Sequence, residues 1–223
     1  MTTPLVKPGE TPRRVLATRS ARWAIALAQW LARHGARPNA VSVCGVVFAG
    51  AASAAFAVSA SVEGGPRAVL LVVAAAGIQL RLLCNLLDGM IAVEHGFKTK
   101  TGDIYNDLPD RLADVAILVG AGYSACAIAD GVILGWAAAV MALFTAYVRL
   151  LAGSLGVTQH FIGPMAKQHR MFTLTLATLA AVGETLLDAP PRAVGIGLAV
   201  IVAGSVVTVF RRTARMVRDV TAR

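Results

Sequence analysis

The stretch "CNLLDGMIAVEHGFKTKTGDIYNDLPDR", from Cys84 to Arg111, decides how the rest of the chain is interpreted. It begins at the end of an apolar run and then gathers acids, amides and glycines. Asn85 and Asp88 are three residues apart, and Asn106 and Asp110 are four apart, so each pair shares one face of a helix. Polar residues placed in this way beside an apolar run indicate a site at the edge of a membrane span.

The composition of the whole chain is that of a membrane protein. Of its 223 residues, 57% are hydrophobic and only 15% are charged, whereas about a quarter of a soluble domain is charged. The formal net charge is +9, but the basic residues lie between apolar runs, which favours anionic lipid over nucleic acid as partner. Cys44, Cys84 and Cys126 form no CxxC motif and are interpreted as small buried hydrophobic residues.

Six apolar runs approach the roughly 20 residues that a transmembrane helix needs. They are Ala40–Val62, Ala68–Leu87, Pro109–Ala129, Gly131–Leu151, Pro164–Leu187 and Ala193–Phe210. The prediction is an all-α protein, an integral membrane six-helix transmembrane bundle. No leader with an apolar core is expected in the first 35 residues.

The basic residues orient this bundle in a cell membrane with both ends cytoplasmic, since cytoplasmic segments carry the excess of Lys and Arg. Two connections expected on that side carry Lys98 and Lys100, and Lys167 and Arg170. The two ends carry Lys7, Arg13, Arg14, Arg19, Arg22, Arg33 and Arg37, and Arg211, Arg212, Arg215, Arg218 and Arg223.

The segment Arg13–His34 places Leu16, Trp23, Leu27 and other apolar residues at helical spacing among arginines. We interpret it as an N-terminal interfacial amphipathic helix; a soluble amphipathic helix packed on a partner is the alternative. The predicted organisation is a cytoplasmic segment 1–38, a transmembrane domain 39–210 and a basic tail 211–223.

Topology places Asp88 and Asp110 at the same depth, because one ends the second span and the other begins the third. Facing helices would then present hard oxygen ligands, which suit Mg²⁺ or Mn²⁺. Gly89 and Gly102 leave room for a flat or phosphorylated ligand, and Pro109 predicts a late start or a kink in the third helix. Any one acid alone is better explained as a helix cap or a solvated loop acid; the spaced set indicates a site.

At this point the sequence resembles the CDP-alcohol phosphotransferase family, whose pattern is D-x-x-D-G-x-x-A-R-x8-G-x-x-x-D-x-x-x-D. Every interval matches, and "RPNAVS", Arg37 to Ser42, before the first span is also similar to the family. The matching positions are Asn85, Asp88, Gly89, Ala92, Val93, Gly102, Asn106 and Asp110. Three of them depart from the pattern: Asn85 and Asn106 replace aspartates, and Val93 replaces the arginine.

The resemblance implies transfer of a phosphatidyl group from CDP-diacylglycerol, or another CDP-alcohol, to a small alcohol acceptor with release of CMP. It implies that Asn85, Asp88, Asn106 and Asp110 hold two divalent cations, Mg²⁺ or Mn²⁺, with Asp110 as the base. The implied CDP-binding residues are Asp88, Gly89, Ala92 and Gly102. Weaker metal binding is expected because two ligands are amides, and Asp103 or Asp107 is a second hypothesis for compensation.

Basic residues in a second polar segment, Arg149, Lys167 and Arg170, resemble those with which relatives bind a phosphorylated acceptor. Positive-inside bias with snorkelling to headgroups is the alternative explanation. Arg81, on the same face as Asp88, is interpreted as a counter-charge to Asp114. The acceptor stays open among glycerol phosphate, inositol phosphate, serine and others, and homodimerisation, common among relatives, stays open too.

Two other functional classes explain parts of the sequence. A family member that has lost catalysis and binds lipid or nucleotide, or scaffolds a partner, would explain the missing acids and Val93. A small transporter would explain Arg81 and Arg149, but transporters tend to place charge near the bilayer midplane. Here the charge gathers at one edge, which favours the enzyme.

Overall fold

A computed structural model describes residues 21–94, 102–125 and 130–222, and all regular secondary structure in these residues is helical. This confirms the all-α prediction. The helices are α1 (Arg22–Arg33), α2 (Pro38–Ser59), α3 (Gly64–Glu94), α4 (Gly102–Ser124), α5 (Gly131–Ser154), α6 (Lys167–Leu186) and α7 (Ala193–Thr221).

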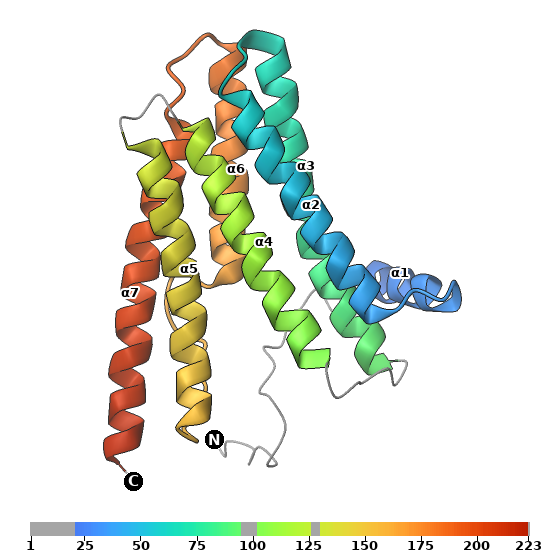
Figure 1. Cartoon of the computed structure of the whole chain (residues 1–223), viewed down its shortest axis with the longest axis vertical. Helices are drawn as coiled ribbons and strands as arrows, with labels where there is room; N and C mark the ends of the chain where they lie inside the picture. The colour runs from blue at the N-terminus through green and yellow to red at the C-terminus, as the bar shows by residue number, and fades with distance from the viewer. Residues whose placement is uncertain (1–20, 95–101, 126–129, 223) are drawn as a thin grey trace.

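The six long helices pack as a closed ring in the order α2, α3, α6, α7, α5 and α4, with α4 again beside α2. Figure 1 shows them running along the long axis of the molecule, with α1 lying across the ends of α2 and α3. The start of α4, the end of α5 and the end of α7 lie at that same end of the bundle (Figure 1). Residues from separate parts of the sequence therefore meet there.

Four helices, α2, α3, α5 and α7, are long and apolar enough to cross a membrane. This indicates a multi-pass membrane protein and supports four of the six predicted spans. Helices α4 and α6 occupy the places of the other two spans and do not reach the same hydropathy. Both carry charged residues in their N-terminal parts, among them Asp110 and Lys167, so these polar residues lower the hydropathy of the two segments.

Two helix ends differ from the predicted spans. Helix α4 begins at Gly102 and continues through Pro109, where the third span was expected to start. The proline leaves one backbone carbonyl without its helical hydrogen bond but does not end the helix. Helix α7 continues past Phe210 to Thr221, and Arg212 on it is buried, donating to the backbone oxygens of Ile162 and Thr145 at 3.0 and 2.7 Å.

Helix α1 packs the buried Ala24 and Ala28 toward the bundle, in a cluster with Leu87 and Ile91 of α3. On its other side Trp23 and Trp30 are exposed. This arrangement leaves aromatic side chains free to meet the membrane interface, and that location stays a prediction.

The core of the bundle is built largely from alanine, which lets the helices approach closely. One tight crossing joins α4 to α5 at Gly122 and Gly135. A Cβ atom on Gly122 would lie 2.8 Å from the Cα of Gly135, and one on Gly135 would lie 2.7 Å from the Cα of Gly122. The crossing therefore admits glycine only.

We predict that Gly135→Ala destabilises the protein, although alanine normally stabilises a helix relative to glycine by about 0.5–1 kcal/mol. Overpacking costs about 1–3 kcal/mol, which for a chain of this size lowers Tm by several degrees. The matched control is Gly50→Ala on the exposed face of α2, where a Cβ meets nothing within 4 Å. Thermal unfolding in detergent measures both variants, and an unchanged Tm for Gly135→Ala would contradict the tight crossing.

Candidate active site

A small pocket opens where α2, α3 and α4 meet, at the end of the bundle that carries α1. It is lined by Ser42, Gly45, Val46, Arg81, Cys84, Asn85, Asp88, Pro109, Asp110 and Ala113. Both acids of the sequence motif whose side chains are described, Asp88 and Asp110, thus reach one shared space. The predicted facing of the two helices is present in the structure.

Asp88 is buried, and its two oxygens are in different situations. Oδ2 accepts a hydrogen bond of 2.6 Å from the hydroxyl of Ser42 on α2. Oδ1 is buried and has no hydrogen-bond partner among the residues that the structure describes. An unpartnered buried carboxylate oxygen costs free energy, so Asp88 has the features of a side chain that is completed by a ligand.

Asp110, by contrast, has protein partners on both oxygens. Oδ1 accepts from Arg81 Nη2 at 2.8 Å and from Asn85 Nδ2 at 3.0 Å. Oδ2 accepts from Lys167 Nζ, and Arg111 Nη2 lies 3.7 Å from the same oxygen. Lys167 comes from the first residue of α6, so Asp110 joins α3, α4 and α6.

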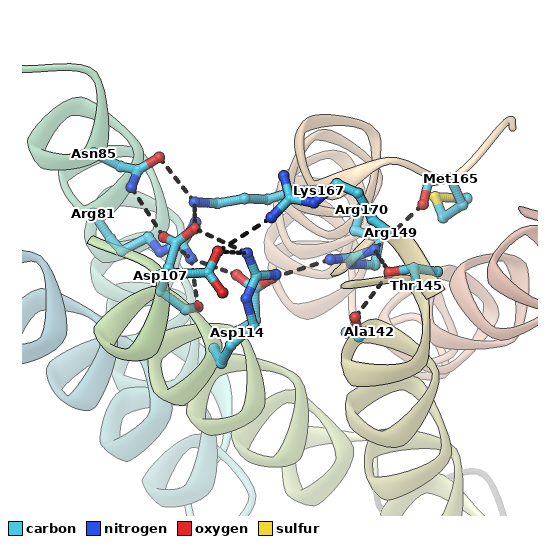
Figure 2. A network of polar contacts seen from close by, with 12 residues as sticks. Arg81, Asn85, Asp107, Asp114, Ala142, Thr145, Arg149, Met165, Lys167 and Arg170 are labelled. Carbon is cyan, nitrogen blue, oxygen red and sulfur yellow. Dashed lines mark hydrogen bonds and ion pairs between the residues drawn. The ribbon is translucent and has the colours of Figure 1, made fainter. Parts of the chain in front are cut away.

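Lys167 also reaches the amide of the motif. Its Nζ donates to Asn85 Oδ1 at 2.8 Å, and Figure 2 shows the long side chain extending from α6 toward Asn85. The ammonium group is therefore shared between an amide oxygen and a carboxylate oxygen.

Beneath these residues, Asp114 is held between two buried arginines. Arg81 Nη2 lies 2.5 Å from Asp114 Oδ1, and Arg170 Nη2 lies 3.1 Å from Oδ2. The side chains of all three residues are only 1% exposed. Arg170 also donates to Thr145 Oγ1 at 3.0 Å and to the backbone oxygen of Met165 at 3.3 Å (Figure 2). The Arg81–Asp114 pair predicted from the sequence is confirmed, and it fixes the floor of the site.

A more exposed cluster lies beside the pocket. Asp107 Oδ1 accepts from Arg111 Nη2 at 2.9 Å and from Arg149 Nη2 at 3.2 Å. The guanidinium of Arg149 also lies over the ring of Phe161, 5.8 Å from its centroid. The side chain of Arg149 is a quarter exposed and is held by Asp107 on one side and by Phe161 on the other. Its guanidinium group is therefore oriented to bind a further anion.

The structure brings together most of the residues predicted from the sequence, namely Asn85, Asp88, Asp107, Asp110, Arg149, Lys167 and Arg170. Gly89 and Ala92 lie on α3 close to Asp88, and Gly89 is buried. The side chains of Asp103 and Asn106 are outside the described residues, as is the surrounding of Gly102, so their predicted roles stay predictions.

Sequence reasoning missed three contributors. Ser42 lies inside the quoted "RPNAVS" segment, but only the fold shows that its hydroxyl reaches Asp88. Arg111 adjoins Asp110 in the sequence and bridges to Asp107, which the i, i+4 spacing could have indicated. Thr145, which accepts from Arg170 in the apolar α5, carried no signal in the sequence.

Some residues of the pocket are suited to binding a divalent cation and others are not. Oxygen atoms around the pocket are the type that Mg²⁺ and Mn²⁺ prefer, and Asp88 Oδ1 is buried without a partner. In the described residues, however, no three His, Cys, Asp or Glu side chains form a metal cluster. Asp110 is already neutralised by Lys167 and Arg81. The residues therefore fit one cation at Asp88 more readily than a pair.

No protein-family model matches the chain, and no curated protein matches its sequence. Its fold is nevertheless similar to crystal structures of a phosphatidylinositol phosphate synthase from Mycobacterium tuberculosis. The structure of that enzyme with CDP-DAG bound has a TM-score of 0.72 and 22% sequence identity, over 88% of this chain and 94% of that one.

A second structure of the synthase, in complex with manganese and citrate, has a TM-score of 0.72 and 20% identity, over 86% of this chain and 88% of that one. The apo form has a TM-score of 0.67 and 22% identity, over 85% and 93%. At these identities the likeness establishes a shared fold over almost the full length of both chains.

Proposed function

We propose that the chain is a membrane CDP-alcohol phosphatidyltransferase, which moves a phosphatidyl group from CDP-diacylglycerol or a similar CDP-alcohol to an acceptor alcohol and releases CMP. The observation that carries the proposal is that Asn85, Asp88 and Asp110 line one pocket. This pocket lies in a fold shared with a synthase that binds CDP-DAG.

The position of the pocket suits a substrate with a lipid part and a nucleotide part. It lies at one end of the bundle, which we place at the cytoplasmic membrane interface with both termini on that side. The CDP part would lie along Asp88, Gly89 and Ala92 of α3 and near Gly102 of α4. The diacylglycerol part would stay among the apolar outer faces of the helices.

Asp88 is the residue that would hold a divalent cation, Mg²⁺ or Mn²⁺, because its Oδ1 has no partner in the described part of the chain. The other motif positions, Asn85, Asn106 and Asp110, are the remaining candidate ligands, and Asp103 and Asp107 the candidate compensating acids. When bound, the cation would supply charge neutralisation at the pyrophosphate. With few charged protein ligands, the phosphate oxygens of the substrate would complete much of its coordination shell.

In the proposed reaction the oxygen of the acceptor hydroxyl forms a bond to the phosphorus distal to cytidine. The bond from that phosphorus to the bridging oxygen breaks, and CMP leaves with the electron pair. Asp110 accepts the hydroxyl proton at Oδ2, which has a lone pair left beside its hydrogen bond from Lys167. A carboxylate so neutralised is a weak base, so Asp110 would take the proton as the bond to phosphorus forms and not before it.

The basic residues near the pocket divide into two roles in this proposal. Arg149 and Lys167 are partly exposed, so they can contact the phosphate of a phosphorylated acceptor or of the donor. Arg170 is fully buried against Asp114, so we assign it a positioning role, in which it holds Asp114 and through it Arg81. The identity of the acceptor is left to experiment, and a homodimer is compatible with this arrangement.

The proposal predicts that purified protein releases CMP from radiolabelled CDP-diacylglycerol with Mg²⁺ or Mn²⁺ and one member of a panel of alcohols. Asp88→Ala should lower this release by at least a hundredfold, because it removes the unpartnered carboxylate. The matched control is Asp130→Ala, an exposed acid at the start of α5 that makes no side-chain cap hydrogen bond. The rate of CMP release by Asp130→Ala should equal that of the unchanged protein.

The same assay tests the alternative of a family member without catalysis. Two features support that alternative: Asn85 replaces an aspartate of the motif, and Asp110 is already neutralised by Arg81 and Lys167. Absence of CMP release with every alcohol and both metals, from protein that still binds CDP-diacylglycerol in a filter or calorimetric measurement, would replace the enzyme by the binding protein.

A further inference from the structure

We propose that the ammonium group of Lys167 takes the place of one of the two divalent cations of this type of site, so that the protein binds at most one divalent cation per chain. The inference deepens the proposed function and rests on it for the meaning of the pocket. It concerns what fills the side of the pocket formed by Asn85 and Asp110.

The first argument is the pattern of contacts. Lys167 Nζ donates to Asn85 Oδ1 at 2.8 Å and to Asp110 Oδ2, and Asn85 Nδ2 donates to Asp110 Oδ1 at 3.0 Å. The three side chains form a closed ring of hydrogen bonds from α3, α4 and α6, and Figure 2 shows the contact between Lys167 and Asn85. A cation placed between the oxygens of Asn85 and Asp110 would occupy the position of Nζ.

The second argument is the chemistry of Asn85. A carboxylate at this position would repel Asp110 unless a cation lay between them. The amide instead donates its N–H group to Asp110 and accepts from Lys167 with its oxygen. Asn85 and Asp110 therefore have their hydrogen bonds with a single positive charge, that of Lys167, between them. The substitution of aspartate by asparagine in the motif and the presence of Lys167 therefore compensate each other.

The third argument is the local charge. The described side chains around the site include four carboxylates and five basic groups, which leaves one positive charge in excess before any metal binds. These are Asp88, Asp107, Asp110 and Asp114, and Arg81, Arg111, Arg149, Lys167 and Arg170. One divalent cation at Asp88 raises this excess to three positive charges, of which the pyrophosphate of a CDP-alcohol neutralises two. A second one beside Arg81 and Lys167 would meet repulsion from two neighbouring cations.

The experiment counts bound Mn²⁺ on the purified full-length protein in detergent, with CDP present and without turnover. The electron paramagnetic resonance signal of free Mn²⁺ measures the uptake. The unchanged protein should saturate at no more than one Mn²⁺ per chain. The double variant Asn85→Asp/Lys167→Gln should bind one Mn²⁺ more than the unchanged protein, because it restores a carboxylate and removes the ammonium group.

The matched control is Arg215→Gln, which removes one positive charge at the same end of the bundle, on α7, where Arg215 pairs with Asp219 outside the pocket. Its Mn²⁺ count should equal that of the unchanged protein. The proposal is overturned if the unchanged protein binds two Mn²⁺, if the double variant gains none, or if Arg215→Gln gains as much. Should the double variant fail to fold, Asn85→Asp alone, with Lys167 retained, should bind no more Mn²⁺ than the unchanged protein, and a gain of one Mn²⁺ in this variant overturns the proposal.

The result is independent of CMP release. If the protein releases no CMP but the Mn²⁺ count increases by one in the double variant, the proposed function fails and the assignment of Lys167 stands. If CMP is released and the count is two in the unchanged protein, the assignment of Lys167 fails and the proposed function stands.

Discussion

Asp114→Asn is expected to lower the free energy of unfolding by about 3–5 kcal/mol, the usual cost of breaking a buried ion pair by removing one partner. Asp114 is the carboxylate between Arg81 and Arg170, and all three side chains are 1% exposed. Its loss leaves Arg170, within the described part of the chain, with the neutral acceptors Thr145 Oγ1 and the Met165 backbone oxygen. Since domains are stable by about 5–15 kcal/mol in total, this one change removes a large part of the stability.

The matched control for this effect is Asp107→Asn on the same helix. Asp107 also bridges two arginines, but its side chain is 38% exposed, so water replaces the lost contacts and the cost should be below about 1 kcal/mol. Thermal unfolding in detergent compares the two variants. Equal Tm values would show that the buried pair adds no stability.

A double variant that removes both charges of one buried pair tests whether the destabilisation by Asp114→Asn comes from the unpaired charge or from altered packing. Asp114→Leu with Arg170→Met removes both charges of one pair and replaces them with apolar side chains of similar length. Buried ion pairs replaced in this way often retain stability. We expect the double variant to be more stable than Asp114→Asn, although Arg81 then depends on Asp110 alone.

The six long helices could be located from the sequence because each contains an apolar run, and four of them are long and apolar enough to cross a membrane. Their ends were less predictable. The start of α4 at Gly102 was missed because its first turns carry Asp107 and Asp110, which resemble a loop when only hydropathy is considered. The polar character that obscured the helix is the same character that builds the site.

The site itself was predictable to the level of helix faces. Spacing placed Asn85 with Asp88 and Asp110 with Asp114, and matched depth placed the two helices opposite each other. The pairing of Arg81 with Asp114 could be predicted because a charged side chain in an apolar segment is costly unless an opposite charge lies beside it. The hydrogen bond from Lys167 to Asn85 joins residues 82 positions apart in the sequence through a long flexible side chain. The spacing of residues along one helix cannot predict such a contact, because the packing of α3 against α6 brings the two residues together.

Asp110→Asn is expected to lower the rate of CMP release by about a thousandfold while the protein stays folded. Removing a general base typically costs between about 10² and 10⁴ in rate, and the amide cannot accept a proton. Folding should survive because Arg81 keeps its second partner, Asp114, at 2.5 Å. The contrast with Asp114→Asn follows from position: Asp110 faces the pocket, whereas Asp114 lies beneath it.

A control of the same chemistry is Asp188→Asn in the connection between α6 and α7. Asp188 is exposed and has a positive φ of 49°, a conformation that asparagine tolerates as well as aspartate. Initial rates at saturating CDP-diacylglycerol should be unchanged in this variant. For Asp110→Asn the KM for CDP-diacylglycerol should change only a few-fold, since a base acts on the acceptor and not on donor binding. A rate within tenfold of the unchanged protein would assign the proton transfer to another group.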